Sequence, residues 1–167
     1  AEIVSDAGGK YAVPGFIDGH IHLESTFISP AEFSKIAAMH GTSAVITDPH
    51  ELANVAGTDG IDYMLAATEN LPIDVFFMIP SCVPASYVDE TGATLAHTAI
   101  KKYMKNERVL GLAEMMNYPG VLSADKEVLA KLSAAAKFDK EIDGHAPGLT
   151  GSQLSAYCAA GINSDHE

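Results

Sequence analysis

The sequence predicts an α/β fold in which a parallel sheet alternates with helices and closes toward a barrel. Short apolar runs rich in β-branched residues alternate along the chain with amphipathic stretches of helical period. Histidines and carboxylates recur directly after the apolar runs. Because parallel strands present their C-terminal ends at one face, these side chains are expected to meet there.

Six strands are predicted, over residues 13–22, 44–49, 74–80, 109–115, 140–145 and 161–166. Five helices are predicted between them, over residues 30–40, 59–70, 94–105, 125–137 and 151–160. The number of residues per predicted strand matches a TIM-type (β/α)8 barrel, which typically needs about 250 residues for eight strands. We therefore expect a partial barrel with about six of its eight strands.

Several helix boundaries carry local signals. The segment Ser29–Glu32 has the pattern of a capping box, with proline at the first helical position. Thr150–Gln153 repeats the same Ser/Thr-x-x-Glu/Gln spacing. Gly41 and Gly161 stand where the first and last helices are expected to stop.

The first residues depart from the strand and helix alternation. Asp6–Lys10 contains two glycines and predicts a hairpin turn between two short strand fragments. We interpret residues 1–12 as the remnant of a small β domain and residues 13–167 as an incomplete barrel.

Composition excludes several classes of protein. The net charge is −12 and Arg108 is the only arginine, so a nucleic acid polymer would be repelled. No apolar run approaches the roughly 20 residues that cross a bilayer, and no basic, apolar leader is present. A cytoplasmic protein without membrane contact is therefore expected. Cys82 and Cys158 lack the spacing of a metal or disulfide motif and are predicted to be reduced packing residues.

The potential ligands follow the predicted strands. His20 and His22 are two residues apart on one strand, so both imidazoles point to the same side. Alone, this pair could equally be two ordinary strand-end histidines. Further candidates follow the second, fourth, fifth and sixth strands: Asp48 and His50, Glu114, His145, and His166. Imidazole and carboxylate ligands suit manganese, iron or zinc, and the absence of nearby cysteines argues against a thiolate-rich zinc site.

Each candidate also has a structural interpretation. Glu114 lies inside an apolar run, where an unpaired carboxylate is costly to bury, so a ligand role is favoured. His145 follows a glycine and could simply occupy a turn. Asp48 and His50 could equally have a functional role or form a local turn at Pro49. Asp18 is expected to bond to the backbone or to support a ligand.

Five segments carry a family resemblance: PGFIDGHIHLEST, ITDPHELANVAG, GLAEMMNYPG, IDGHAPGL and AGINSDHE. Together they resemble the adenine deaminases of the amidohydrolase superfamily. The first segment alone is shared with other branches, such as dihydroorotases and sugar deacetylases, and the other four are more specific. The resemblance runs from about residue 9 to the last residue and covers only the first part of such an enzyme.

The resemblance implies a metal-dependent hydrolase barrel that converts adenine to hypoxanthine and ammonia in purine salvage. It implies His20 and His22 at one divalent metal ion, His145 and His166 at a second, and Glu114 bridging the two. Mn²⁺ or Fe²⁺ is the first choice, with Zn²⁺ as the alternative. The family places a further aspartate after the eighth strand, which has no counterpart in these 167 residues.

Proton transfer and substrate binding complete the predicted site. Glu114 and His50 are the catalytic candidates, because deamination needs a carboxylate or imidazole within about 3 Å to move a proton. Glu24 and Asp48 are the candidates for binding adenine, the expected small-molecule partner. We expect the enzyme to be a homo-oligomer.

Two alternatives stay open. The chain could belong to another amidohydrolase, acting on a cyclic amide or an acetamido sugar. It could also be a non-catalytic metal-binding or assembly module. Because six strands cannot close an eight-stranded barrel, residues 1–167 alone are expected to associate through exposed edges and to lack activity.

Overall fold

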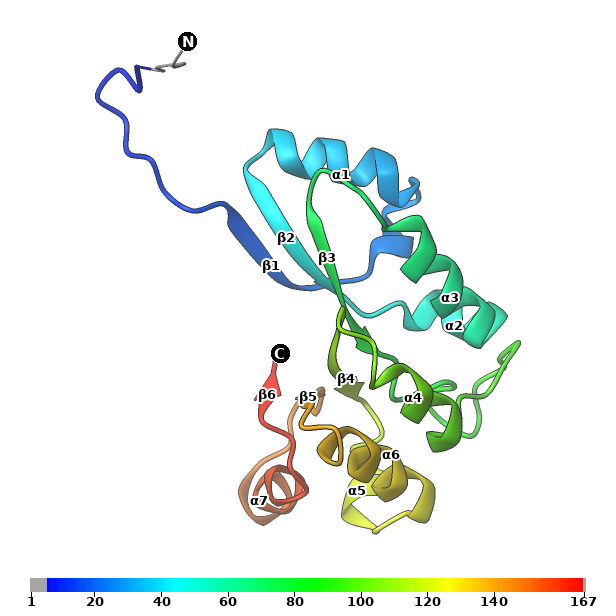
Figure 1. Cartoon of the computed structure of the whole chain (residues 1–167). Helices are drawn as coiled ribbons and strands as arrows, with labels where there is room; N and C mark the ends of the chain where they lie inside the picture. The colour runs from blue at the N-terminus through cyan, green and yellow to red at the C-terminus, as the bar shows by residue number, and fades with distance from the viewer. Residues whose placement is uncertain (1–5, 167) are drawn as a thin grey trace.

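Six parallel strands lie side by side in the order of the sequence in the computed structural model, which describes residues 6–166. They are β1 (Phe16–Ile21), β2 (Thr42–Thr47), β3 (Asp74–Ile79), β4 (Val109–Met115), β5 (Glu141–Gly144) and β6 (Ser164–Asp165). The sheet curls, and helices cover its outer side (Figure 1). The predicted partial barrel is therefore confirmed.

Every connection between neighbouring strands contains at least one helix. The α-helices are α1 (Pro30–Met39), α2 (His50–Ala56), α3 (Thr58–Ala67), α4 (His97–Tyr103), α5 (Tyr118–Leu122), α6 (Lys126–Ala136) and α7 (Gly151–Ala159). A short 3-10 helix, η1 (Leu23–Thr26), follows β1. The five predicted helices correspond to α1, α3, α4, α6 and α7, whereas α2, α5 and η1 were not predicted. Within residues 6–166, no helix combines the length and apolar character that crossing a bilayer requires.

The unpredicted helices are short and depend on caps. The N-terminus of α2 is capped from η1, because Glu24 Oε1 accepts the amide N–H groups of Glu51 and Leu52 at 3.1 and 3.3 Å. Asn117 Oδ1 caps α5 by accepting the amide N–H of Gly120 at 3.0 Å. Helices of seven and five residues show too little of the helical period to be recognised from sequence.

Two predicted strands have different limits because of proline. The strand predicted over 13–22 begins at β1, after Pro14, and the strand predicted over 44–49 ends before Pro49. Proline lacks the N–H that a strand ladder needs. The sixth predicted strand, over residues 161–166, is reduced to the two residues of β6.

Of the two predicted capping boxes, the first forms its N-cap hydrogen bond. Ser29 Oγ accepts the amide N–H of Glu32 at 3.3 Å at the start of α1. The prediction at Thr150 is wrong, because its side chain makes no capping hydrogen bond. Gly151 there has a positive φ of 58°, so the chain enters α7 through a left-handed residue rather than through a standard cap. Gly41 and Gly161 end their helices as predicted.

The predicted turn near the N-terminus is present, since the Lys10 amide N–H donates to the Ala7 carbonyl at 3.0 Å. Residues 11–15 are not a strand, so the fragment predicted after the turn is wrong. The fragment predicted before the turn falls largely on residues 1–5, outside the described residues. The assignment of residues 1–12 to a separate β domain stays a prediction.

The hydrophobic core lies between the sheet and its helices. On β3, Val75, Phe77 and Ile79 are buried, whereas the alternate residues Phe76 and Met78 are only half-buried. This alternation is the period of a strand with two different environments on its two faces. The inner face of the curled sheet is therefore less well covered than the outer face.

The single arginine joins three elements on the outer side of the sheet. The Arg108 guanidinium, just before β4, donates to the Leu65 carbonyl of α3 at 2.8 Å and to the Thr68 carbonyl at 3.4 Å. Its Nε donates to the Val75 carbonyl of β3 at 3.1 Å. The same group lies 5.2 Å from the centre of the Phe77 ring. These donors satisfy carbonyls at the end of α3 that the helix leaves unpaired.

We predict that Arg108→Lys destabilises the full-length protein by about 1 to 3 kcal/mol, because one ammonium cannot replace a planar fork that reaches several carbonyls. Urea denaturation measures the change. The matched control is Lys35→Gln, which removes an exposed partner of Glu32 and is expected to cost less than about 0.5 kcal/mol. Equal effects of the two substitutions would show that the bonds of Arg108 contribute nothing beyond a surface charge.

Candidate metal centre

The two histidines at the end of β1 face each other through ring nitrogens. His22 Nδ1 lies 2.8 Å from the Asp48 carbonyl. Because a carbonyl only accepts, this nitrogen carries a proton, and in the neutral ring His22 Nε2 has the lone pair. His20 Nε2 lies 3.1 Å from that Nε2. Asp18 Oδ1 accepts the His20 amide N–H at 3.2 Å, which confirms its predicted bond to the backbone.

The donor set at this point fits a divalent cation. His20 Nδ1 lies 3.7 Å from the Asp143 carboxylate, which favours a proton on Nδ1 and a lone pair on Nε2. Two lone pairs at 3.1 Å repel each other unless a proton or cation lies between them. This separation suits two nitrogens that coordinate the same ion, each at about 2.1 Å.

Glu114 lies between two groups of histidines at the end of β4, and it is 3% exposed. Its Oε1 lies 3.2 Å from His50 Nδ1 and 3.7 Å from His22 Nε2. Its Oε2 lies 3.1 Å from His145 Nδ1 and 3.3 Å from His166 Nε2. Burial alone would raise the pKa of Glu114, but the hydrogen bond to His50 and the surrounding imidazoles hold that pKa below its usual value. Each oxygen therefore faces its own pair of imidazoles.

The structure brings all five predicted metal ligands together with three further side chains. Potential ligand atoms lie within 4.8 Å of one another in three groups: His22, Asp48, His50 and Glu114; His20, Asp143 and His166; and Glu114, His145 and His166. His20 and His22 fall in different groups although their Nε2 atoms are close. Among residues 6–166 no thiol joins these groups, which agrees with a site of imidazoles and carboxylates.

Asp48 and His50 form a buried pair beside Glu114. Asp48 is 2% exposed, and its Oδ2 lies 2.9 Å from His50 Nδ1. Burial raises the pKa of Asp48. Burial would lower the pKa of His50, but its hydrogen bonds to Asp48 and Glu114 outweigh this and raise the pKa to about 10. Asp48 Oδ1 is buried and has no hydrogen-bond partner in the described part of the chain.

Glu24 has a clear structural role, because its Oε1 caps α2. Its Oε2 is buried and has no hydrogen-bond partner among residues 6–166. Burial raises the pKa of Glu24. Glu24 belongs to none of the three groups of ligand atoms, so its predicted role with substrate stays a prediction.

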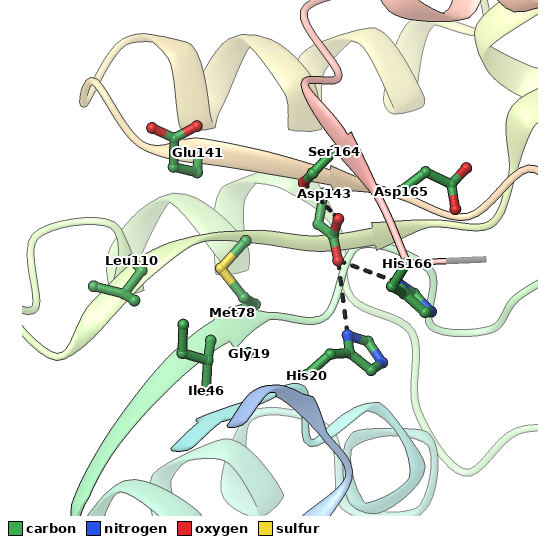
Figure 2. Close-up of a pocket in the computed structure, with 10 residues that line it drawn as sticks. All are labelled: Gly19, His20, Ile46, Met78, Leu110, Glu141, Asp143, Ser164, Asp165 and His166. Atoms are coloured by element: carbon green, nitrogen blue, oxygen red, sulfur yellow. Dashed lines mark hydrogen bonds and ion pairs between the residues drawn. The ribbon is translucent and has the colours of Figure 1, made fainter. Parts of the chain in front are cut away.

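Asp143 on β5 was not predicted as a site residue. Its Oδ2 lies 3.7 Å from His20 Nδ1 and 3.4 Å from His166 Nδ1, and its Oδ1 accepts the Ser164 hydroxyl at 2.7 Å (Figure 2). The two imidazole rings stack with their centres 3.7 Å apart. The available signal was its spacing of two residues from His145, which places both side chains on one side of the strand.

A cavity of about 460 Å³ adjoins the histidines on the inner face of the sheet. Ile46, Met78 and Leu110 form its apolar part, and His20, Asp143 and His166 lie at its polar end (Figure 2). The alternate, half-buried residues of the strands thus become the wall of this cavity.

The cysteines differ in their surroundings. Both are free. Cys82 is buried, as predicted, with Sγ 3.7 Å from Met115 Sδ. Cys158 is exposed, so its prediction as a packing residue is wrong. It lies on α7, whose only buried residue is Tyr157, so most of that helix faces solvent.

Sequence comparison identifies related proteins. The model of the amidohydrolase family matches residues 11–167. An adenine deaminase of Clostridium acetobutylicum is 53% identical over 162 residues, which are 97% of this chain and 28% of that protein. Adenine deaminases of Desulfatibacillum aliphaticivorans and Oleidesulfovibrio alaskensis are 50% and 54% identical, over 100% and 98% of this chain and 29% of each relative. The chain thus spans less than a third of the length of these relatives.

We predict that Asp143→Asn weakens metal binding by the full-length protein about 10- to 100-fold, because carboxylates that orient ligand histidines contribute on this scale. Titration with Mn²⁺ followed by calorimetry measures the change. Glu141→Gln is the matched control: Glu141 lines the same cavity on the same strand and joins none of the groups of ligand atoms. Equal affinities in the two variants would rule out a role for Asp143 beyond its charge.

Proposed function

We propose that this chain, which belongs to the amidohydrolase family, supplies part of the active site of an enzyme that hydrolyses adenine to hypoxanthine and ammonia. The observation that carries the hydrolytic part is Glu114, whose two oxygens face separate pairs of imidazoles. The choice of adenine rests on the relatives, which are named adenine deaminases and match nearly the whole chain.

The proposed cofactor is a pair of divalent ions. His20 and His22 would hold one ion, His145 and His166 would hold the other, and Glu114 would bridge them. Mn²⁺ or Fe²⁺ is the first choice and Zn²⁺ the alternative, because all three accept imidazole and carboxylate ligands. When bound, such ions lower the pKa of water and so supply a hydrolytic nucleophile near neutral pH.

Proton transfer is assigned to His50 and Glu114. Deamination must carry a proton to the departing amine, so a group near the reacting carbon has to accept and release it. The 2.9 Å contact with buried Asp48 fixes the His50 ring, and its Nδ1 also faces Glu114 Oε1 at 3.2 Å. Because both carboxylates engage Nδ1, proton exchange with the substrate is left to Nε2.

Substrate recognition is assigned to Glu24 and Asp48. Each has one buried oxygen without a hydrogen-bond partner among residues 6–166, and such atoms in a folded protein need an explanation. A purine has N–H groups from which these oxygens can accept hydrogen bonds. Burial raises the pKa of both carboxyl groups.

The wider setting is proposed on composition and exposure. We expect the whole protein to act in purine salvage in the cytoplasm, as a homo-oligomer. A net charge of −12 disfavours a nucleic acid polymer as a partner. On β1, Phe16 and Ile17 are 67% and 68% exposed, so this edge can accept a further strand.

The proposed function predicts which substrate the protein accepts. The full-length protein is expected to convert adenine to hypoxanthine with release of ammonia, and to act poorly on adenosine because the resemblance implies a closed pocket for a free base, which would leave little room for ribose. Purine absorbance and a coupled ammonia assay measure both reactions. Equal activity on adenosine, or activity only on a cyclic amide or acetamido sugar, would contradict the proposal.

The proposed function also predicts the metal content of the protein. Elemental analysis of the full-length protein, expressed with added manganese, is expected to give about two divalent ions per chain. His20→Ala should remove one or both ions, because it deletes a nitrogen that faces His22. His40→Ala is the control, since His40 is exposed at the end of α1 and lies outside the cluster. Wild-type protein without metal would contradict the proposed centre.

A further inference from the structure

We propose that the Tyr157 hydroxyl is a positioning group for the metal centre, which holds Glu114 and His145 at the correct separation before any ion binds. This inference rests on the proposed function, because it assigns those two residues to the centre. Tyr157 lies on α7. The hydrogen bonds of its hydroxyl within residues 6–166 join it to backbone groups and not to the side chain of a proposed ligand.

Tyr157 connects the ends of two neighbouring strands. Its side chain is 1% exposed. The hydroxyl donates to the Met115 carbonyl at 2.7 Å and accepts the His145 amide N–H at 3.0 Å. Met115 directly follows Glu114, and His145 is itself a proposed ligand. One hydroxyl group therefore links the backbone beside the bridging carboxylate to the backbone of a ligand on the next strand.

The hydroxyl lies where the regular strand ladder is interrupted. β4 and β5 pair in parallel through Gly111 with Glu141 and Leu112 with Ile142, and the register shifts before Met115 pairs with Gly144. In a regular parallel ladder, the Met115 carbonyl can accept the amide of the residue after its partner, which is His145. Here the tyrosine hydroxyl stands between these two groups and bonds to both.

The close approach of the ring to β5 is built into the sequence. A Cβ atom on Gly144 would lie 3.2 Å from Tyr157 Cε1 and 2.6 Å from the Ser164 carbonyl. Glycine avoids the collision with the Ser164 carbonyl of β6 and lets the ring pack closely against the strand end. This observation is independent of the hydrogen bonds and shows that the strand end and the tyrosine fit each other.

Loss of the hydroxyl would act mainly on one half of the centre. Without it, the Met115 carbonyl and the His145 amide would lose the group that joins them, and the strand ends would have to move or admit water. His145 Nδ1 lies 3.1 Å from Glu114 Oε2, so such a movement changes the ligand geometry of the His145 and His166 side. The His20 and His22 side shares only Glu114 with this contact and should change less.

The test is Tyr157→Phe in the full-length protein, because phenylalanine keeps the ring and removes only the hydroxyl. We expect the dissociation constant of the ion held by His145 and His166 to rise about 10- to 100-fold, the scale seen for groups that support ligands, while the ion held by His20 and His22 is affected less. Calorimetric titration separates the two ions. Electron paramagnetic resonance of the loaded protein should show less coupling between the two Mn²⁺ ions.

Tyr103→Phe is the matched control. Tyr103 on α4 also uses its hydroxyl twice, donating to Asp62 Oδ1 at 2.8 Å and lying 3.2 Å from the Thr58 carbonyl. Neither partner belongs to the cluster. Thermal unfolding of both variants measures the general cost of losing a bonded hydroxyl, and Tyr103→Phe should leave both Mn²⁺ affinities unchanged.

Amide hydrogen exchange gives a second measurement that does not need a variant. In wild-type protein treated with a chelator, the His145 amide is expected to exchange slowly, because the bond to Tyr157 forms before metal binds. Rapid exchange there overturns the inference, as does a Tyr157→Phe protein that binds two ions with wild-type affinities. A fall of both affinities in step with thermal stability also overturns it. Wild-type protein that binds no ion contradicts the proposed function itself.

Discussion

The burial of one carboxylate governs the rest of this structure. Glu114 is 3% exposed at the centre of the sheet, and a charge removed from water needs nearby compensation. Imidazoles supply it from the ends of several strands, together with the helix start at His50. Their convergence needs a parallel sheet that curls, because only then do ends far apart in sequence meet around one point. The fold and the site therefore both depend on the need to compensate the buried carboxylate of Glu114.

Much of this arrangement could be predicted because its signals are local. Apolar runs mark the strands, and His20, His22 and Glu114 stand at or directly beyond them. What could not be predicted depends on partners distant in sequence. The helix α2 begins where it does because Glu24 caps it from η1. The failed capping prediction at Thr150 has a local cause, the positive φ of Gly151, that the residue pattern does not reveal.

The site divides in the same way. Residue type and position identified the five proposed ligands, whose role in metal binding stays a prediction. The supporting contacts were missed because each is a tertiary contact: Asp143 serves two histidines from different strands, and the Ser81 hydroxyl donates to the Glu114 carbonyl at 2.6 Å. The buried Lys131 ammonium in turn donates to the Ser81 carbonyl at 2.8 Å. Backbone atoms carry much of this support, and sequence patterns say little about them.

The contact between Gly144 and Tyr157 has an evolutionary consequence. A side chain at position 144 would collide with the Ser164 carbonyl of β6 and crowd the Tyr157 ring, and a smaller residue at position 157 would remove the hydroxyl that joins the two strand ends. Neither position can change alone without loss. Among descendants of a common ancestor, glycine at position 144 and tyrosine at position 157 should therefore both persist.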